Sequence, residues 1–450
     1  MTATAIATAT ADAVPVAPGR LPVIGHALAF RKDPIGFLTS LSEIGELVKV
    51  YLGPVQTFVV TSPRLAHQML VTDSAGYDKG RLFDMLRRTV GNGLLTSEGA
   101  FNRRQRRLMQ PGFSSKRIAD YVGIMRRRTE DMMAGWQSGD VIDVQRMTDE
   151  LSLGIGVETL FNTDLCATAV DTVRECLPII LKGVVARTVL PDVVCKLPVP
   201  ALRRITRAEQ RIRDAIGTII EAYRADDTDR GDMLTALLAA RDENGQGMTD
   251  EQVRDELVTL VLAAAETTSS VLASVFYRIS ENPEVDRKVA AEIDGHLAGR
   301  PIEYDDMKKL PYTLNMLSEV LRLDIPADWF SRRTTKEMVL GETELPARTE
   351  LMYSIPALHR NPEVYPDPER FDPDRWVSRP ARDLPKGSYI PFGSGSRICI
   401  GNAFAWSELT TVTATVLSKW KLTVAPGAKP ERLHRITTHF ADLPMTITAR

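Results

Sequence analysis

The sequence predicts a mainly α-helical protein with small peripheral β-sheets, built as a single large domain around a long central helix. Helical patterns dominate from Pro63 to about Thr334, and one apolar stretch, Thr249–Glu281, is long enough to cross a domain. Alternating β-rich residues are confined to two short regions, Glu46–Ser62 and Met338–Leu351. This pattern is typical of a helical core with small sheets at its edge.

The N-terminal segment 1–16 is a low-complexity Ala/Thr stretch without a basic start or a sustained apolar run. It is therefore predicted to be a disordered tail rather than a signal peptide or a membrane anchor. The folded domain is predicted to occupy residues 17–450. In its first β-rich region, a Gly-Pro pair between two alternating runs predicts a hairpin.

The central helix carries clear end signals. Thr249 and Gln252 have the spacing of a capping box, and Asn282-Pro283 ends the pattern. Roughly 30 residues is longer than an ordinary surface helix. Because the middle of the stretch is apolar nearly all round, we expect it to be buried.

Composition excludes several classes of protein. The 450 residues carry 56 basic and 58 acidic side chains, so a net charge of −2 gives no general attraction to nucleic acid. The cysteines show neither a CxxC pair nor zinc-ligand spacing, which argues against a structural zinc or a disulfide framework and favours the cytoplasm. They are Cys166, Cys176, Cys195 and Cys399. No run of about 18 apolar residues occurs, so no membrane span is predicted.

The most informative segment is FGSGSRICIG, at Phe392–Gly401. Glycines such as Gly393 and Gly401 let the backbone approach a large ligand closely. A helix predicted to begin near residues 400–405 would direct its positive end towards the Cys399 sulfur. We interpret Cys399 as a thiolate ligand of haem iron, with Arg397 as a partner for a haem propionate. A lone cysteine is otherwise usually a small buried hydrophobic residue.

The central helix also contains AAAETT, which puts an acid and two hydroxyls inside an apolar span. A buried carboxylate is costly unless it is paired or solvated, and a threonine can bond back to the carbonyl four residues earlier. One interpretation is a polar contact between helices. The other is a proton relay through Glu266 and Thr267 beside a bound ligand, with Ala264 leaving space for it.

Two further charged motifs have alternative interpretations. Glu319 and Arg322 lie on one helix face at i, i+3, either as a surface ion pair or, given their apolar neighbours, as a buried pair joined by Arg375. The RRQRR run at Arg103–Arg107 is either a solvated face or a functional one. In the functional case Arg106 would reach a haem propionate and its neighbours would attract an acidic partner.

From about Pro18 to its C-terminus the chain resembles the cytochrome P450 family of haem-thiolate monooxygenases. The resemblance is carried by five segments in the family's order: NRRQRRLMQPGF, AAAETT, the ExxR pair, PERFDPDRW and FGSGSRICIG. It implies the fold of that family, haem b as cofactor and O2 as co-substrate.

The resemblance also implies roles for individual residues. Cys399 would be the iron ligand, and Glu266 with Thr267 the acid–alcohol pair that supplies protons. Two sets complete the assignment: cofactor-binding residues Arg397, Arg332, Arg106, Asn102, Phe392, Gly393, Gly401 and Ala264, and a structural triad of Glu319, Arg322 and Arg375. The chain departs from the family pattern at Ala264 (often Gly), at Asn102 (usually Trp or His) and at Asp324-Ile325 (usually aromatic-proline).

For function, the resemblance implies an oxidoreductase that takes electrons from a separate ferredoxin and ferredoxin reductase, and a monomer without nucleic acid partners. Its substrate is predicted to be an apolar small molecule. The overall run is similar to bacterial oxygenases of cyclic terpenes, which suggests a sesquiterpene or diterpene and a place in terpenoid or antibiotic biosynthesis. Predicted substrate-contacting residues are Phe83, Leu86, Ala264, Asp328, Trp329 and Phe440.

Three alternatives remain open on the sequence. The first concerns the substrate class, because a polyketide or a fatty acid would also be apolar. The second is a peroxygenase that uses hydrogen peroxide directly, which would not need the Glu266–Thr267 relay. The third is a haem-thiolate sensor without catalytic activity, which would need neither the relay nor a basic docking face.

Overall fold

The computed structural model describes residues 9–161, 199–226, 228–434 and 437–450, together with residues 168, 169, 171–173, 175, 176, 179, 180 and 183. Backbone contacts group the chain into two units. The sheet unit comprises Met1–Phe83 and Ser318–Cys399, and the helical unit comprises Asp84–Leu317 and Ile400–Arg450. Each unit is described by itself below, and the prediction of one domain over residues 17–450 stays a prediction.

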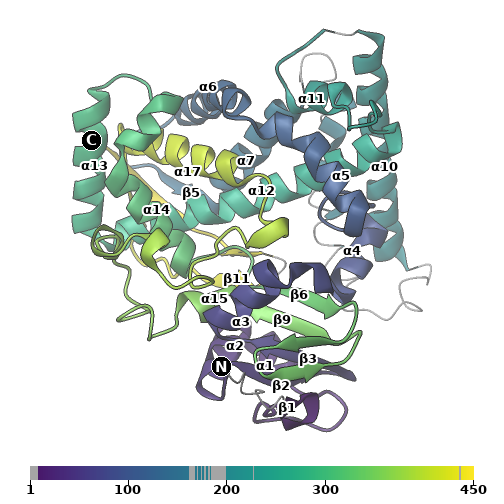
Figure 1. The fold of residues 1–450 in the computed structure, drawn as a ribbon. Coiled ribbons are helices and arrows are strands. Elements are labelled where there is room, and N and C mark those ends of the chain that lie inside the picture. Colours follow the sequence, from purple (N-terminus) through teal and green to yellow (C-terminus); the bar gives the residue numbers. More distant parts are fainter. Residues whose placement is uncertain are drawn as a thin grey trace, which may run out of the picture. The chain divides into compact units, whose positions relative to one another are not determined.

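The sheet unit is organised around a five-stranded sheet of order β2-β3-β9-β6-β4 (Figure 1). The predicted hairpin is confirmed, because β2 (Leu47–Leu52) and β3 (Val55–Val60) pair antiparallel around the Gly-Pro turn. The second predicted β region is also confirmed, as β7 (Met338–Leu340), β8 (Thr343–Leu345) and β9 (Glu350–Ser354).

Two strands of this sheet, β4 and β6, were not predicted. Segment β6 (Trp329–Thr334) lies in the stretch expected to be helical, yet it pairs antiparallel with both β9 and the two-residue β4 (Tyr77–Asp78). The short helices and turns of the unit are η1 (Ala11–Ala13), α1 (Ala27–Lys32), α2 (Pro34–Ser40), η2 (Leu41–Glu43), α3 (Pro63–His67), η3 (Gln68–Thr72), η4 (Ser74–Gly76), α15 (Ile355–His359), α16 (Arg375–Ser378), η7 (Ala381–Asp383) and η8 (Gly395–Arg397).

Ordered contacts begin inside the segment predicted to be a tail. Ala9–Thr10 form β1, which pairs parallel with β8, and Val14 is buried. Because β8 has an edge that β7 does not occupy, its unpaired backbone groups accept this additional short strand. The prediction of a disordered tail over 1–16 is therefore wrong for residues 9–16, and residues 1–8 lie outside the described part.

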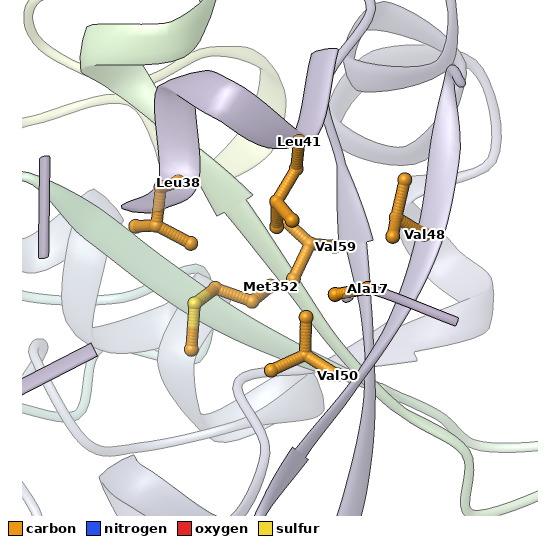
Figure 2. Close-up of a cluster of buried hydrophobic side chains, with 7 residues drawn as sticks. All are labelled: Ala17, Leu38, Leu41, Val48, Val50, Val59 and Met352. Carbon is orange, nitrogen blue, oxygen red and sulfur yellow. The ribbon is translucent and has the colours of Figure 1, made fainter. Parts of the chain in front are cut away.

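Figure 2 shows the apolar cluster that fixes the N-terminal part of the sheet unit. Side chains from α2 and η2 meet side chains from β2, β3 and β9, and Ala17 of the lead-in segment packs among them. The members are Ala17, Leu38, Leu41, Val48, Val50, Val59 and Met352, all 3% exposed or less. This burial ties the lead-in segment to the sheet, since each removed apolar side chain would leave a cavity.

The helical unit is built around the predicted central helix. Helix α12 (Asp250–Glu281) is capped by Thr249, whose hydroxyl accepts the Gln252 N–H while the Gln252 side chain accepts the Thr249 N–H, so the predicted capping box is confirmed. It packs along α7 (Val144–Leu160) and also contacts α10 and α17 (Figure 1). Among the described residues it is the one helix apolar and long enough to span a membrane, but 72% of its apolar window is buried in the protein.

The remaining elements of the helical unit surround α12. Strands β10 and β5 flank β13 in one small sheet, and β11 pairs with β12. Helices α4 (Arg81–Val90) and α14 (Pro311–Leu323) cross the unit boundary in sequence. The other bounds are α5 (Gly99–Met109), η5 (Gln110–Phe113), α6 (Ser115–Met133), β5 (Val141–Asp143), α10 (Pro200–Ala225), α11 (Met233–Ala239), α13 (Pro283–Leu297), η6 (Tyr304–Lys309), α17 (Asn402–Leu417), β10 (Trp420–Val424), β11 (Arg432–His434), β12 (Thr438–Phe440) and β13 (Pro444–Ala449).

Candidate functional site

The cysteine loop of the sheet unit has a fixed backbone and an exposed thiol. The Cys399 N–H donates to the Phe392 carbonyl at 2.9 Å, which closes the loop. Gly393 and Gly395 both have φ near +70°, a conformation that residues with a side chain rarely adopt. A Cβ on Gly395 would lie 2.0 Å from the Leu70 carbonyl oxygen, so only glycine fits there. The loop therefore presents Cys399 at the surface of its unit.

The helix predicted after the loop is present. Helix α17 begins at Asn402, with Gly401 as its N-cap residue. The prediction placed this start at residues 400–405. Because glycine has no side chain, it leaves the first backbone N–H groups of α17 unobstructed. These groups and the positive end of the helix favour the anionic form of a residue just before the helix.

Two arginines of the sheet unit converge on one buried phenol. Arg332 Nη1 donates to the Ser331 carbonyl at 2.7 Å, and Arg397 Nη2 donates to the Tyr77 carbonyl at 3.0 Å. Burial raises the pKa of Tyr353, and the positive charges of Arg332 and Arg397 both oppose that rise. The Arg332 guanidinium carbon is 5.4 Å from the ring centre.

This donor set fits a haem. A thiolate is a known axial ligand of haem iron, and guanidinium groups form paired hydrogen bonds with carboxylates such as the propionates. Cys399, Arg332 and Arg397 all belong to the sheet unit, although they come from segments far apart in sequence. A cofactor with one metal and two carboxylates requires an accessible sulfur and cationic hydrogen-bond donors, and this unit contains both.

Asn102, a predicted cofactor contact, has hydrogen-bond partners inside the helical unit. Asn102 lies on α5, is 9% exposed, and donates from Nδ2 to the Leu94 carbonyl at 2.9 Å and to the Ser97 hydroxyl at 3.1 Å. Both amide hydrogens are thus used inside the helical unit. Asn102 thus holds the 94–97 loop on α5, and its contact with the cofactor stays a prediction. Arg106, one turn along α5, is half-buried.

The RRQRR segment is less basic at its surface than its sequence suggests. Arg104 Nε donates to Asp242 at 2.6 Å, and Arg107 lies 3.1 Å from Glu243. These carboxylates, far away in sequence, neutralise two of the charges that were expected to form a docking face. Arg103 is exposed.

A clamp that the sequence analysis missed holds the loop before α5. Asp255 Oδ2 accepts the Asn92 N–H and Glu256 Oε2 accepts the Leu94 N–H, both at 2.7 Å. Both acids lie on α12 and are buried, Glu256 completely. The available signal was two adjacent acids directly before the apolar stretch of α12, since buried carboxylates are retained only where donors meet them.

The predicted acid–alcohol pair lies halfway along α12. Thr267 Oγ1 donates to the Ala263 carbonyl at 2.7 Å, which is the expected back-bond to the residue four positions earlier. Glu266 is half-buried, and its Oε2 accepts a hydrogen bond from Thr437 Oγ1 at 3.2 Å. Thr437 lies just before β12 and was not predicted, because nothing in the sequence links it to Glu266.

Three of the predicted substrate residues pack within their own units. Phe83 stacks on Phe330 with ring centres 6.5 Å apart, and Trp329 meets the Phe30 ring edge-on at 5.6 Å. Phe440 is 2% exposed, 5.2 Å from the Tyr277 ring. These aromatic side chains have core partners, so their bulk alone was a weak signal for a substrate contact.

The other three predicted substrate residues are half-buried. They are Leu86, Ala264 and Asp328. Ala264 Cβ faces α7, where a methyl group on Gly156 would approach it to 3.3 Å. The small side chains therefore let α7 and α12 come close together, which is a packing reason for alanine at this position.

The predicted structural triad is assembled in the sheet unit. Glu319 and Arg322 are fully buried, and the guanidinium meets the carboxylate through two hydrogen bonds of 2.8 and 2.9 Å. Arg375 Nε donates to the same carboxylate at 2.9 Å. The structure thus brings together the three residues that the sequence analysis grouped.

The triad has further members that sequence reasoning missed. Trp376 Nε1 donates to Glu319 Oε2 at 3.0 Å, so this carboxylate accepts from three side chains. Arg322 also donates to the carbonyls of His359, Pro368 and Arg370 at 2.7 to 3.1 Å. The network therefore ties α14 to the irregular segment before the cysteine loop, with every charge compensated.

A second buried acid lies in the helical unit. Glu408 of α17 is 1% exposed, and burial raises its pKa from 4.5 to about 8, although the hydroxyls of Ser152 and Thr268 favour the ionised form. Its Oε1 has no hydrogen-bond partner among the described residues. Glu408 is therefore mainly neutral at pH 7, as expected for a carboxyl group without a cation beside it.

This burial predicts a pH-dependent stability. The unfolded chain releases the Glu408 proton near pH 4.5 but the folded chain releases it near pH 8, so its contribution to stability is complete below pH 4.5 and falls as pH rises towards 8. Replacing Glu408 by Gln gives a neutral side chain that does not titrate in this pH range. As the pH rises from 5.5 to 7.5, we expect the free energy of unfolding of the variant to increase by about 2–3 kcal/mol relative to that of wild type. Guanidinium unfolding at each pH measures this difference.

An exposed acid provides the control for this measurement. Glu150 on α7 has a side chain that is 68% exposed, so Glu150→Gln should leave the pH profile parallel to that of wild type. Parallel profiles for Glu408→Gln would contradict the assignment of a raised pKa to Glu408.

Comparisons with known proteins agree with this geometry. A family model described as Cytochrome P450 matches residues 15–443. Cyclooctat-9-en-7-ol 5-monooxygenase of Streptomyces melanosporofaciens is 39% identical, over 96% of this chain and 95% of its own length. Pentalenene oxygenase of Streptomyces avermitilis is 36% identical, over 96% and 97%. A crystal structure of the cytochrome P450DA heme domain has the same fold, with a TM-score of 0.87, 23% identity and 98% coverage of both chains.

Proposed function

Because the chain belongs to the cytochrome P450 family and is a haem b monooxygenase that uses O2, we propose that it hydroxylates or further oxidises a cyclic terpene. The observation that supports this substrate class is the agreement of two relatives. Each is at least 36% identical over almost the whole chain, and each is named for the oxidation of a cyclic terpene. A shared fold alone would not support a substrate class.

We assign Cys399 as the residue whose thiolate would bind haem iron, and the bound haem would supply the oxygen chemistry of the reaction. The loop supports this role because its backbone is fixed while the thiol is exposed. Arg332 and Arg397 would bind the propionates, since carbonyl contacts already hold both guanidinium groups in place. Such fixed donors lose little freedom when a carboxylate binds.

Glu266 and Thr267 would hold and transfer protons. A carboxyl group can exchange a proton with water, and a hydroxyl can pass it on. The Thr437 contact fixes the rotamer of the Glu266 carboxyl, and the bond to the Ala263 carbonyl fixes the Thr267 hydroxyl. The apolar stretch 260–265, which precedes the pair on α12, would limit proton leakage on that side.

We further propose a monomeric, cytoplasmic enzyme that takes electrons from a ferredoxin and its reductase. The arginines of α5 support binding of an acidic protein partner. Arg103 would contribute more of the attraction to that partner than the sequence suggested. Arg104 and Arg107 already meet Asp242 and Glu243, and such pairs attract a partner weakly.

The test of the substrate class is a binding titration of the purified haem-loaded protein. Members of the panel would be a cyclic sesquiterpene, a cyclic diterpene, a linear fatty acid and a macrolide. We expect one of the cyclic terpenes to change the haem absorption spectrum at the lowest concentration. The best binder is then incubated with NADPH, ferredoxin, ferredoxin reductase and ¹⁸O2, and the product of the first hydroxylation is expected to contain one ¹⁸O atom.

Preference for the fatty acid or the macrolide would contradict the terpene assignment while leaving the monooxygenase assignment intact. Product formed with hydrogen peroxide but none with the ferredoxin system would contradict the proposed electron route. Binding without any product in either system would support a sensor instead.

A further inference from the structure

A tight turn near the N-terminus of the sheet unit exposes apolar side chains. Leu21 and Gly25 exchange two backbone hydrogen bonds of 3.0 Å, which closes a turn between them. The side chains on this turn point outward, with Leu21 44%, Val23 90% and Ile24 39% exposed. Val23 also has φ +63°, a strained conformation for a β-branched residue. Exposure and strain at one residue indicate a functional constraint.

The turn is held rigidly. His26 is buried, its Nδ1 accepts the Tyr51 N–H at 3.0 Å and its Nε2 lies 2.9 Å from the Ala17 carbonyl oxygen. A Cβ on Gly25 would lie 2.2 Å from the Tyr51 oxygen, so the backbone of the turn is pressed against β2. Ala17 is itself fixed in the cluster of Figure 2. The turn therefore cannot rotate to bury its apolar side chains.

Helix α1, which follows the turn, extends the same surface. Leu28 is 56% exposed, and Arg31 and Lys32 lie three and four residues later, on the same helix face. Phe30 points the other way, onto Trp329. The neighbouring acid, Asp33, is engaged at the start of α2, where it accepts the Gly36 N–H at 2.9 Å.

A third cation lies on the other side of the turn. The guanidinium of Arg20 stacks over the Tyr51 ring, 3.7 Å from its centre, and Arg20 is exposed. The surface thus consists of an apolar lip, defined as Leu21, Val23, Ile24 and Leu28, with Arg20, Arg31 and Lys32 around it. An apolar tip surrounded by cations is complementary to lipid chains beneath anionic headgroups.

We propose that the apolar lip docks this protein peripherally on the surface of an anionic lipid bilayer. Val23, at the tip of the turn, enters the boundary between headgroups and acyl chains, and the three cations meet lipid phosphates. A protein partner fits less well, because a stable protein interface covers about 800 Å² per partner and this tip is a single turn wide. The inference does not depend on the proposed substrate, and it concerns a surface remote in sequence from Cys399.

The test is co-sedimentation of the haem-loaded protein with vesicles of phosphatidylcholine, with and without phosphatidylglycerol. We expect binding to the anionic vesicles that weakens with added salt. Val23→Asp should lower the partition coefficient at least tenfold. Neutralising Arg31 and Lys32 together (Arg31→Ser/Lys32→Ser) should lower it by about fivefold per cation.

Val377→Asp is the matched control, because Val377 is 64% exposed in the same unit but lies outside the lip. It should bind vesicles like wild type. Three results would overturn the proposal: no binding of wild type to anionic vesicles, equal binding by Val23→Asp and wild type, or self-association of wild type that Val23→Asp abolishes. The last result would identify the lip as a contact between two copies. None of these outcomes bears on terpene oxidation, so the two proposals fail independently.

Discussion

Replacing Cys399 by Ser is expected to remove monooxygenase activity and the absorption band that marks a thiolate-ligated haem in its reduced carbon monoxide complex. A serine hydroxyl is a poor iron ligand at neutral pH because it stays protonated. We expect the rate of product formation to fall at least 100-fold, about 2.7 kcal/mol or more in the barrier. The measurement is the spectrum of the reduced carbon monoxide complex together with turnover of the best terpene from the titration.

A second cysteine provides the control. Cys176 is the other cysteine among the described residues, and it is fully buried in the helical unit. Cys176→Ser should retain the thiolate spectrum, even if it lowers stability. A Cys399→Ser protein that kept the wild-type band would refute the ligand assignment.

Replacing Arg322 by Ala is expected to destabilise the protein strongly. The change leaves the buried Glu319 carboxylate with Arg375, Trp376 and the Asp372 N–H as its donors. It also removes the Arg322 hydrogen bonds to the carbonyls of His359 and Pro368. Breaking a buried ion pair from one side costs about 3–5 kcal/mol. We expect this loss in guanidinium unfolding, accompanied by poor haem retention, because the network holds the segment that precedes the cysteine loop.

The chain contains a matched pair for comparison. Asp305 and Lys308 have the same i, i+3 spacing as Glu319 and Arg322, but their side chains are 79% and 74% exposed. Lys308→Ala should therefore cost less than about 1 kcal/mol. Similar losses for Lys308→Ala and Arg322→Ala would show that burial of the ExxR pair has no energetic consequence.

Features determined by nearby residues could be predicted from the sequence. The ends of α12 follow from Thr249, Gln252 and the Asn282-Pro283 pair, and the hairpin follows from a turn between two alternating runs. The burial of Glu319 with Arg322 could be predicted because their neighbours on α14 are apolar. In each case the residues that determine the feature lie close together in the sequence.

Features determined by residues far apart in sequence could not be predicted from the sequence. Arg104 appeared free for a partner, but Asp242 meets it from a loop more than a hundred positions away. The contact between Thr437 and Glu266 joins a short strand region to a long helix, and no pattern in either segment records the other. Strand β6 was missed for the same reason, since its partner β9 supplies the pairing that its own sequence does not demand.

The order of strands in the five-stranded sheet has a consequence for how the protein is made. Strand β3 leaves the ribosome early, whereas β9, which pairs with it in the finished sheet, follows only after the entire Asp84–Leu317 segment has been synthesised. Until then the β2–β3 hairpin presents an unpaired edge, the kind of surface on which nascent chains aggregate. We therefore expect the sheet unit to be most prone to aggregation during translation, before β9 covers that edge.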